Sequence, residues 1–344
     1  MKLNKRDFLK TVGAGSAVLA MPMIARAAPI ELKLSHYLPP QHQLHGVLAE
    51  WADDLRAQSG GELDIKVFPA GQMGPPPRQY DLVRTGAADF AYIFTAFYPG
   101  RFPLTDLLSL PFLLVGPDAK PRKAAETSWL ATRLKPELAG EYVATEMLFS
   151  INLTATGFFM SSVQVMSPDD VKGLRIRPTS GAMAEQLKAM GASPATIPPT
   201  EIADAIAKGV VDGAIFNFEG GRAFQLQQAV NHVSTLANSS ATFSFIANQA
   251  MMEKLPKKYA DLIRETTGPD AARHIGGLYD KAEAGGREFM VGKGVEVVDL
   301  VDGAADPFRA ALKPVYDAQL AATREAAATT DAVMEKIGQL KAEM

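Results

Sequence analysis

The sequence predicts an α/β protein whose sheets are mostly parallel. Short segments of alternating apolar and polar residues, typical of strands, follow segments of helical period closely along the chain. Residues 173–220 are the clearest example, because they read strand, helix, strand, helix, strand. About 317 residues remain after the N-terminal segment described below, and a chain of that length typically forms two domains.

The first hundred residues contain three expected strands and two expected helices. The strands are 30–34, 63–68 and 89–94, and the helices are 41–58 and 79–85. In 41–58 the apolar residues lie on one stripe, which predicts an amphipathic helix. Because helices and strands alternate so closely here, we expect a mostly parallel sheet with covered faces.

The remaining elements continue this alternation and then become mainly helical. We expect strands at 142–149 and 152–159, and then the unit 173–220, with strands ending at Arg177 and Phe216. A further strand is predicted at 241–248 and a short one at 294–298. Helices are predicted at 124–134, 256–266, 269–292 and from 306 to about 340, the last including an alanine-rich, helix-forming tail.

The N-terminus has the pattern of a secretory signal peptide. Basic residues precede an apolar run from 12 to 24, and Ala25-Arg26-Ala27 supplies a small-x-small cleavage pattern. The segment 4–10 also resembles a twin-arginine signal, with Lys5 in place of the first arginine. Cleavage near residue 27 removes five basic residues and one acidic residue, which changes the net charge from −3 to about −7. We expect no nucleic-acid partner for an exported acidic protein.

The chain offers little for catalysis. It has no cysteine, which excludes disulfides and thiol chemistry, and it lacks the common hydrolase, P-loop and dinucleotide-binding motifs. His42 and His45 share one face near a helix start, but no carboxylate in that turn completes a metal site. We therefore predict no metal and no cofactor. A secreted enzyme built around His36, His42 and His45 is the alternative from another class of protein.

Two segments far apart in the chain have the same pattern. In 82–90 and in 205–213 a helix ends on a glycine, an aspartate follows three residues later, and an apolar strand begins. Two related α/β halves that face each other across a cleft would explain this echo. Helix–glycine–strand junctions are also common in any α/β protein, so the pattern alone leaves both interpretations open.

The strand before Pro178 carries two alternating arginines. Arg175 and Arg177 are expected to point to opposite faces of the sheet. Because ligands of open α/β sheets bind beyond the carboxyl ends of the strands, Arg177 is placed to hold a carboxylate through a bidentate contact. A structural salt bridge is the alternative. Aromatic residues gather at other strand ends, where they form either a ligand wall or part of the core.

Seven segments in one order resemble the solute-binding proteins of tripartite ATP-independent periplasmic (TRAP) transporters. The resemblance covers nearly all of the chain after the signal peptide, and the segments are 60–65, 68–74, 86–89, 110–112, 172–177, 191–194 and 209–213. It implies a two-domain periplasmic-binding-protein fold with a central cleft, mixed and mostly parallel sheets, and a long helix that spans both domains. It places residues 28–153 with 243–282 in the first domain and 154–242 with 283–344 in the second.

The resemblance also implies a function. The protein would be a periplasmic, non-enzymatic, monomeric transport component that captures a small organic acid as its cleft closes. It would then deliver the ligand to the membrane permease subunits of a TRAP transporter. A 2-oxo acid held through a metal is an alternative within this family.

The family's carboxylate-binding arginine corresponds to Arg177. Other pocket positions depart from the sialic-acid-binding pattern, since Phe216, Phe94 and Tyr37 stand where polar contacts are expected. These changes favour a monocarboxylate with an apolar or aromatic body, which the pocket would bury while Arg177 fixes its orientation. The predicted ligand-binding residues are Arg177, Phe216, Asn217, Tyr37, His36, Phe94, Tyr92 and Phe158.

Overall fold

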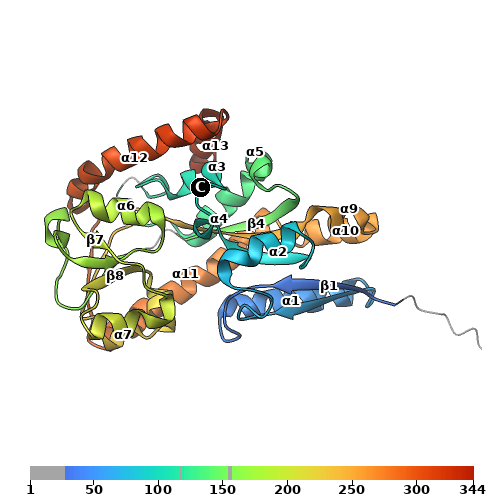
Figure 1. Ribbon diagram of the computed structural model, residues 1–344, viewed down its shortest axis with the longest axis horizontal. Helices are drawn as coiled ribbons and strands as arrows, with labels where there is room; N and C mark the ends of the chain where they lie inside the picture. The colour runs from blue at the N-terminus through green and yellow to red at the C-terminus, as the bar shows by residue number, and fades with distance from the viewer. Residues whose placement is uncertain (1–27, 117, 119, 154–156) are drawn as a thin grey trace, which may run out of the picture.

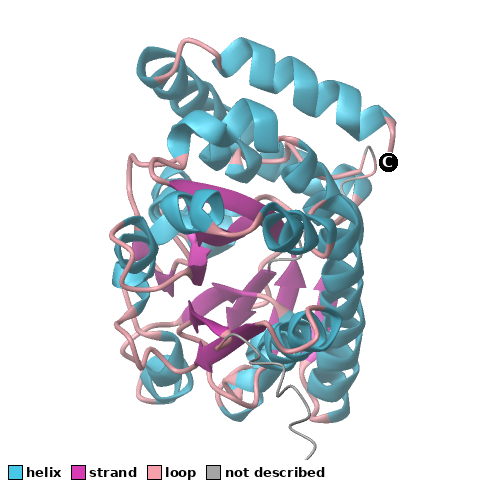
Figure 2. Ribbon diagram, turned by 90° about the vertical axis from the view of Figure 1, so that its right-hand side faces the viewer, coloured by secondary structure: helices cyan, strands magenta, loops and turns pink. Residues whose placement is uncertain are grey.

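The computed structural model describes residues 28–344 except 117, 119 and 154–156. The expected signal peptide, residues 1–27, lies outside the described residues. The chain forms two β-sheets in the interior, each with helices packed around it (Figures 1 and 2). Each sheet and its helices are called a lobe below. The predicted α/β class with two mixed sheets is confirmed.

The sheet of the first lobe has the order β2-β1-β3-β10-β4. β1 pairs in parallel with β2 and β3, whereas β10 runs antiparallel to β3 and β4. Its strands are β1 (Ile30–Ser35), β2 (Leu63–Phe68), β3 (Phe90–Phe94), β4 (Thr145–Leu153) and β10 (Ala241–Asn248). All five residues of β3 are buried, as expected for a strand covered on both faces.

The sheet of the second lobe has the order β11-β9-β5-β8-β6-β7. β5 runs antiparallel to β8 and β9, and the other pairs are parallel. Its strands are β5 (Gly157–Met160), β6 (Arg175–Arg177), β7 (Ser193–Pro194), β8 (Gly213–Phe216), β9 (His232–Thr235) and β11 (Glu296–Asp299). At the edge that faces the first lobe, this order brings the ends of β6 and β8 beside the start of β5.

The helices cover both sheets. Before the chain passes to the second lobe, the helices of the first lobe are α1 (Gln43–Gln58), α2 (Gln79–Arg84), α3 (Pro103–Asp106), α4 (Ala124–Arg133) and α5 (Lys135–Leu138). The second lobe adds α6 (Gly181–Ala189), α7 (Ile202–Ala207) and α8 (Phe218–Ala223). The C-terminal third holds α9 (Gln249–Lys254), α10 (Lys257–Glu265), α11 (Pro269–Gly292), α12 (Asp306–Ala326) and α13 (Thr330–Ala342).

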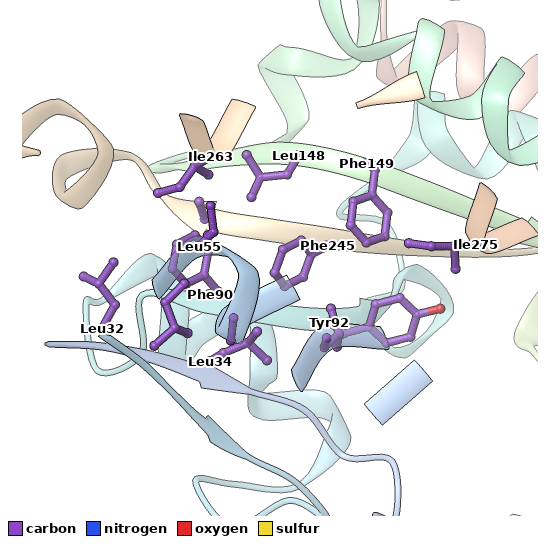
Figure 3. Close-up of a cluster of buried hydrophobic side chains, with 14 of the residues drawn as sticks. Leu32, Leu34, Leu55, Phe90, Tyr92, Leu148, Phe149, Phe245, Ile263 and Ile275 are labelled. Atoms are coloured by element: carbon purple, nitrogen blue, oxygen red, sulfur yellow. The ribbon is translucent and has the colours of Figure 1, made fainter. Parts of the chain in front are cut away.

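The core of the first lobe is a cluster of aliphatic and aromatic side chains between the sheet, α1 and α11. Phe90 and Phe245 stack with ring centroids 5.8 Å apart, and Trp51 meets both rings edge-on. Such pairs stabilise beyond the area that they bury. Tyr92 lies at the border of this cluster, with its hydroxyl group pointing away from Phe90 (Figure 3). The core therefore ends in a polar group near the second lobe.

The repeated pattern in 82–90 and 205–213 corresponds to the same local structure in both lobes. The Asp89 carboxylate accepts a hydrogen bond from the backbone N–H of Lys33 in β1 at 2.7 Å. The Asp212 carboxylate accepts one from the N–H of Arg175 in β6, also at 2.7 Å. In both cases the strand that follows the aspartate pairs in parallel with the strand that donates the bond. Two related halves therefore explain the repeated pattern.

The long helix α11 joins the lobes (Figure 1). On the first lobe, Gly276 lies so close to α4 that an added Cβ would come within 2.4 Å of the Ala124 carbonyl oxygen. One turn later, the Asp280 carboxylate accepts the backbone N–H groups of Ala124 and Ala125 at 2.7 and 3.1 Å. A glycine and a carboxylate on α11 thus hold the start of α4, whose first N–H groups have no partner inside the helix.

The second lobe is held in the same way. The Glu283 carboxylate accepts the N–H groups of Phe218 and Glu219, at 2.9 and 2.8 Å, at the start of α8. Gly286 approaches the same turn, and an added Cβ would lie 2.4 Å from the Phe218 carbonyl oxygen. The predicted helix that spans both domains is confirmed, and its contacts explain why small residues occur at these two positions.

Three expected elements are wrong in their bounds. The predicted strands 142–149 and 152–159 are instead β4 and β5, because β4 continues to Leu153 along β10. The predicted helix from 306 to about 340 is broken between α12 and α13. Residues of α13 are buried in the first-lobe cluster that also contains Leu130, although the segment 283–344 was assigned to the second domain. The division into domains stays a prediction.

Among the described residues, no helix combines the length and apolar character needed to cross a membrane.

Candidate functional site

Arg177 ends β6 at the edge that faces the first lobe. The two arginines of this strand differ as predicted: Arg175 is exposed and contacts Asp212, whereas only 8% of Arg177 is exposed. The Arg177 Nε donates a hydrogen bond to the Ile197 carbonyl oxygen at 3.2 Å. No carboxylate forms an ion pair with Arg177 in the part of the chain that the structure describes. Burial lowers the pKa of Arg177 to about 10.

A buried cation without a counter-ion is unfavourable unless something else compensates its charge. Arg177 remains protonated at neutral pH even with its lowered pKa. Its guanidinium group retains several N–H donors beyond the one that Ile197 accepts. An anion that fits this edge of the sheet would supply the missing charge and accept these hydrogen bonds.

Phe216 and Asn217 follow at the end of β8. The guanidinium carbon of Arg177 lies 5.5 Å from the centroid of the Phe216 ring, within the range of a cation–π contact. The ring also meets Phe159 and Phe224 edge-on. Asn217 Nδ2 donates to a carboxylate oxygen of Glu283 at 3.1 Å, which ties the end of β8 to α11. The second lobe thus presents one cation beside an apolar ring.

The first lobe presents a wall of aromatic rings. Tyr37 stacks on Tyr92 at 6.5 Å and meets Phe97 edge-on at 5.9 Å. Phe94 meets Phe97 at 5.1 Å and stacks on Phe243 at 4.7 Å, and Phe243 in turn stacks on Tyr92 at 5.6 Å. The five rings form a closed chain of contacts at the ends of β1 and β3 and the start of β10. Such a wall can bury an apolar or aromatic ligand.

One polar contact joins the lobes across this region. His42 Nε2, at the start of α1, lies 3.6 Å from a carboxylate oxygen of Glu219 in α8. Only 14% of the His42 side chain and 16% of the Glu219 side chain are exposed. Burial lowers the pKa of His42 to about 4, so the ring is neutral at pH 7. Burial raises the pKa of Glu219, and the Asn217 amide opposes this shift.

His36 lies behind this contact, inside the first lobe. It is fully buried, and its Nε2 lies 3.0 Å from Nδ1 of His45. Burial lowers the pKa of His36 to about 4, and the neighbouring rings of His45 and His42 act in the same direction. Within the described ranges, no three histidine, cysteine, aspartate or glutamate side chains are arranged to hold a metal ion.

The structure brings most of the predicted site residues to the facing ends of the two sheets. Arg177, Phe216 and Asn217 lie on the second lobe, opposite Tyr37, Tyr92 and Phe94 on the first. Phe158 is elsewhere: it is 1% exposed and packs beside Phe308, in the core between the second sheet, α6 and α12. The ligand contacts of these residues stay a prediction.

Four residues of this region are not among the predicted ligand-binding residues, and the sequence indicated His42 only as a candidate for a metal or catalytic site. Phe97 and Phe243 belong to the aromatic wall, and His42 and Glu219 make the contact between the lobes. The start of α8 gave no helical signal because Gly220 and Gly221 follow Glu219 directly. Both positions must be small, since an added Cβ would lie 2.3 Å from the Phe216 ring or 2.9 Å from the Phe159 ring.

A cavity of about 440 Å³ lies on the α11 side of Phe216. Apolar groups and charges of both signs line it, with the segment 120–123 on the first lobe and Phe159, Phe216, Phe218 and Arg287 on the second. Arg177 does not line this cavity, whereas Phe216, whose ring centroid lies 5.5 Å from the guanidinium carbon, does.

Two lobes joined by a long helix, with a buried cation facing an aromatic wall, define a binding protein that encloses a small ligand between its lobes. Comparison with known proteins identifies the family. Residues 34–323 match the bacterial extracellular solute-binding proteins of family 7 (DctP), and the chain belongs to this family. Proteins of this family bind solutes outside the cytoplasm and are not enzymes, and the similar solved structures are solute-binding proteins of TRAP transporters.

Individual relatives are distant in sequence but similar over most of their length. A solute-binding protein of Albidiferax ferrireducens is 26% identical over 88% of this chain and 90% of its own. A TRAP periplasmic solute-binding protein of Bordetella bronchiseptica, solved with bound (R)- and (S)-mandelate, is 28% identical, with a TM-score of 0.76, over 91% of this chain and 100% of its own. A marine-metagenome TRAP protein specific for aromatic acids has a TM-score of 0.82 at 22% identity, over 91% of this chain and 99% of its own.

Proposed function

We propose that this protein is the periplasmic solute-binding component of a TRAP transporter for a small organic monocarboxylate with an apolar or aromatic body. Arg177 binds the carboxylate, and the aromatic wall of the first lobe covers the rest of the ligand. Closure of the lobes buries the ligand, and the closed protein delivers it to the membrane permease subunits. The protein acts as a monomer.

The observation that carries this proposal is the burial of Arg177 without a carboxylate partner among the described residues. A structural arginine at this depth is normally paired, because an unpaired charge inside a protein is destabilising by several kcal/mol, about 3–5 where one partner of a buried pair is removed. A carboxylate ligand supplies the partner. The unpaired charge lowers the stability of the empty protein, and a carboxylate ligand that pairs with it recovers this free energy as binding affinity.

The surroundings of Arg177 support a monocarboxylate. Besides the Ile197 carbonyl oxygen, its neighbour at the sheet edge is the Phe216 ring, which lies within cation–π distance. Glu219 and Glu283, in and beside α8, are carboxylates that disfavour a second negative charge on the ligand near them. The cations Arg122, Lys123 and Arg287 line the cavity on the α11 side of Phe216. The 28%-identical Bordetella bronchiseptica protein binds mandelate, an aromatic monocarboxylate, which agrees with the proposed class.

A thermal-shift screen tests this proposal. A ligand that binds only the native state raises the melting temperature. A free ligand concentration of 100 times the Kd stabilises the native state by about 2.7 kcal/mol. We expect aromatic and branched monocarboxylates, such as benzoate and mandelate, to stabilise the wild-type protein. Arg177→Met should lose this response, whereas the matched variant Arg175→Met, two residues earlier on the exposed face, should keep it. An equal response of all three proteins would contradict the role of Arg177.

A further inference from the structure

The residues at the facing lobe ends form one continuous series of contacts around the region between the lobes. On the second lobe the series runs from Arg177 through Phe216 and Asn217 to Glu219. It crosses to the first lobe at the contact between Glu219 and His42. On that side it passes from His42 to the Tyr279 ring, with ring centroids 6.2 Å apart, and from the Tyr279 hydroxyl group to that of Tyr92. The rings of Tyr37, Phe97 and Phe94 continue it. Arg177 and Glu219 therefore belong to one series of contacts, called the enclosure below, and carry opposite charges.

Glu219 has no cationic partner among the described side chains at neutral pH. Its neighbour His42 is neutral there, since burial lowers the pKa of that ring to about 4. The Asn217 amide donates a hydrogen bond to the Glu219 carboxylate, and the remaining neighbours are acidic or phenolic. Glu283 is a second carboxylate, and its pKa is raised to about 7 by burial, with a smaller contribution from the charge of Glu219. The Glu219 charge also acts on the hydroxyl groups of Tyr92 and Tyr279, because burial and this carboxylate both raise the pKa values of the two phenols.

An independent observation points to a missing group at this position. The Tyr92 side chain is 1% exposed, and its hydroxyl group lies beside the Tyr279 hydroxyl without forming a hydrogen bond of good geometry in the described part of the chain. A buried hydroxyl without a partner is unfavourable by about 1–3 kcal/mol. The Tyr92 ring stacks on Tyr37 and Phe243 of the aromatic wall. A polar group on a ligand that lies against this wall would be within reach of both Tyr92 and Glu219.

We propose that Glu219 determines ligand specificity at the end of the enclosure opposite Arg177. Its carboxylate accepts a hydrogen bond from a hydroxyl or ammonium group on the ligand and repels a second carboxylate. The preferred ligand is then an acid with a hydrogen-bond donor at the far end of its apolar body. This inference rests on the proposed function, because it takes Arg177 to hold the ligand carboxylate.

A purely structural role for Glu219 predicts different behaviour. If the carboxylate only joins the lobes through His42, its removal should weaken every ligand by a similar factor, because each ligand depends on the same closure. If it contacts the ligand, the effect depends on the group that the ligand places there. A comparison of ligands that share one ring and one carboxylate separates the two roles.

The experiment measures Kd by calorimetry for benzoate and for its meta- and para-substituted derivatives that carry a hydroxyl, an aminomethyl or a second carboxylate group. The proteins are the wild type, Glu219→Gln and His42→Gln, the last as the control for lobe contact alone. We expect Glu219→Gln to improve the affinity for the dicarboxylate relative to benzoate at least tenfold in the meta or the para series. The same variant should lower the relative affinity for the donor-bearing acid. A larger loss for the aminomethyl compound than for the hydroxyl compound identifies an ammonium group as the preferred donor.

Equal changes for all ligands in Glu219→Gln, matching those in His42→Gln, would overturn the inference and leave Glu219 with a structural role. The proposed function fails in a distinguishable way. In that case wild type and Arg177→Met bind benzoate equally or not at all, and the inference fails with it. Benzoate binding that depends on Arg177, combined with unchanged ratios in Glu219→Gln, contradicts the inference alone.

Discussion

Each lobe contains the same junction, in which an aspartate accepts the N–H group of a neighbouring parallel strand. That neighbouring strand ends in a different residue in each lobe. In the first lobe Asp89 receives the N–H of Lys33, and two residues later β1 ends at Ser35. In the second lobe Asp212 receives the N–H of Arg175, and two residues later β6 ends at Arg177. The backbone arrangement is the same, and both strand-end residues are buried.

The difference between the lobes lies in the side chains at these equivalent places. The first lobe offers a small hydroxyl residue and a group of rings, whereas the second offers a buried cation and, at α8, a partly buried carboxylate. One lobe can bury an apolar body, and the other can orient a charged group. Related scaffolds thus make unequal contributions to one enclosure, and closure brings the two kinds of contact together.

The largest effect is expected where α11 docks on each lobe. Gly276→Ala and Gly286→Ala place a Cβ 2.4 Å from backbone oxygen atoms of α4 and α8, respectively. Because backbone cannot move aside as a side chain can, each variant should lose about 3 kcal/mol or more of unfolding free energy. Chemical denaturation followed by circular dichroism measures this loss.

Adjacent glycines of the same helix provide matched controls. Gly277 has open space around it, and Gly285 has only the end of the Arg222 side chain nearby, at 3.9 Å. Alanine at these positions should stabilise the helix by up to about 1 kcal/mol. If all four alanine variants behave alike, close docking of α11 does not hold the lobes.

The shared junction predicts similar losses in the two lobes. Asp89→Ala and Asp212→Ala each remove the acceptor of a strand N–H group at 2.7 Å. Each variant should lose about 1–2 kcal/mol of unfolding free energy, because a charge-assisted hydrogen bond disappears. The asparagine variants retain an acceptor oxygen and should lose less. A loss in one lobe only, by denaturant unfolding, would show that the two junctions are not equivalent.

The pH dependence of stability should have a first-lobe contribution from His36. Its pKa is about 4 in the folded protein and 6.5 in the unfolded chain. The unfolded state therefore binds the proton more tightly, and stability present above pH 6.5 is lost as the pH falls toward 4.

Between pH 7 and 5 this amounts to roughly 1–2 kcal/mol, so His36→Gln should flatten the decline in unfolding free energy by that amount. Urea unfolding at the two pH values measures the difference. The same slope in wild type and variant would contradict a neutral, buried His36.

The smallest expected effect concerns the ring beside Arg177. Phe216→Asn should weaken an apolar acid about tenfold, or about 1.4 kcal/mol, because the ligand loses apolar contact with the ring. Phe216→Leu keeps an apolar surface and should lose less. Calorimetry with the best acid from the thermal screen provides both values, and equal affinities of Asn and Leu variants would argue against an apolar wall at this position.

Much of the fold follows from local patterns in the sequence. β2, β10 and α11 have the predicted bounds because alternation or helical period persists to a turn residue at each end. The end of α12 differs from the prediction. Alanine-rich sequence favours a continuous helix, but the chain leaves the helix at Ala327 and α13 folds back so that Val333, Ile337 and Leu340 are buried in the first lobe. Here tertiary burial overrides helix propensity.

The candidate site was predictable only in part for a similar reason. Arg177 stands out because it follows Arg175 by two residues at a strand end, so alternation places it on the buried face. Glu219 and His42 are 177 residues apart, and their contact depends on how α8 and α1 meet across the lobes. No spacing along the chain encodes that contact.

The most direct test of the account compares a carboxylate with its neutral analogue at Arg177. Calorimetry would give Kd for the best acid from the thermal screen and for its primary amide, with the wild type and with Arg177→Met. We expect the wild type to prefer the acid by about 100-fold or more, corresponding to about 2.7 kcal/mol, and the variant not to discriminate between the two compounds. Without ligand, the variant should be at least as stable as the wild type, since an unpaired buried charge has been removed. A variant that still prefers the acid by the same factor would contradict Arg177 as the carboxylate-binding residue.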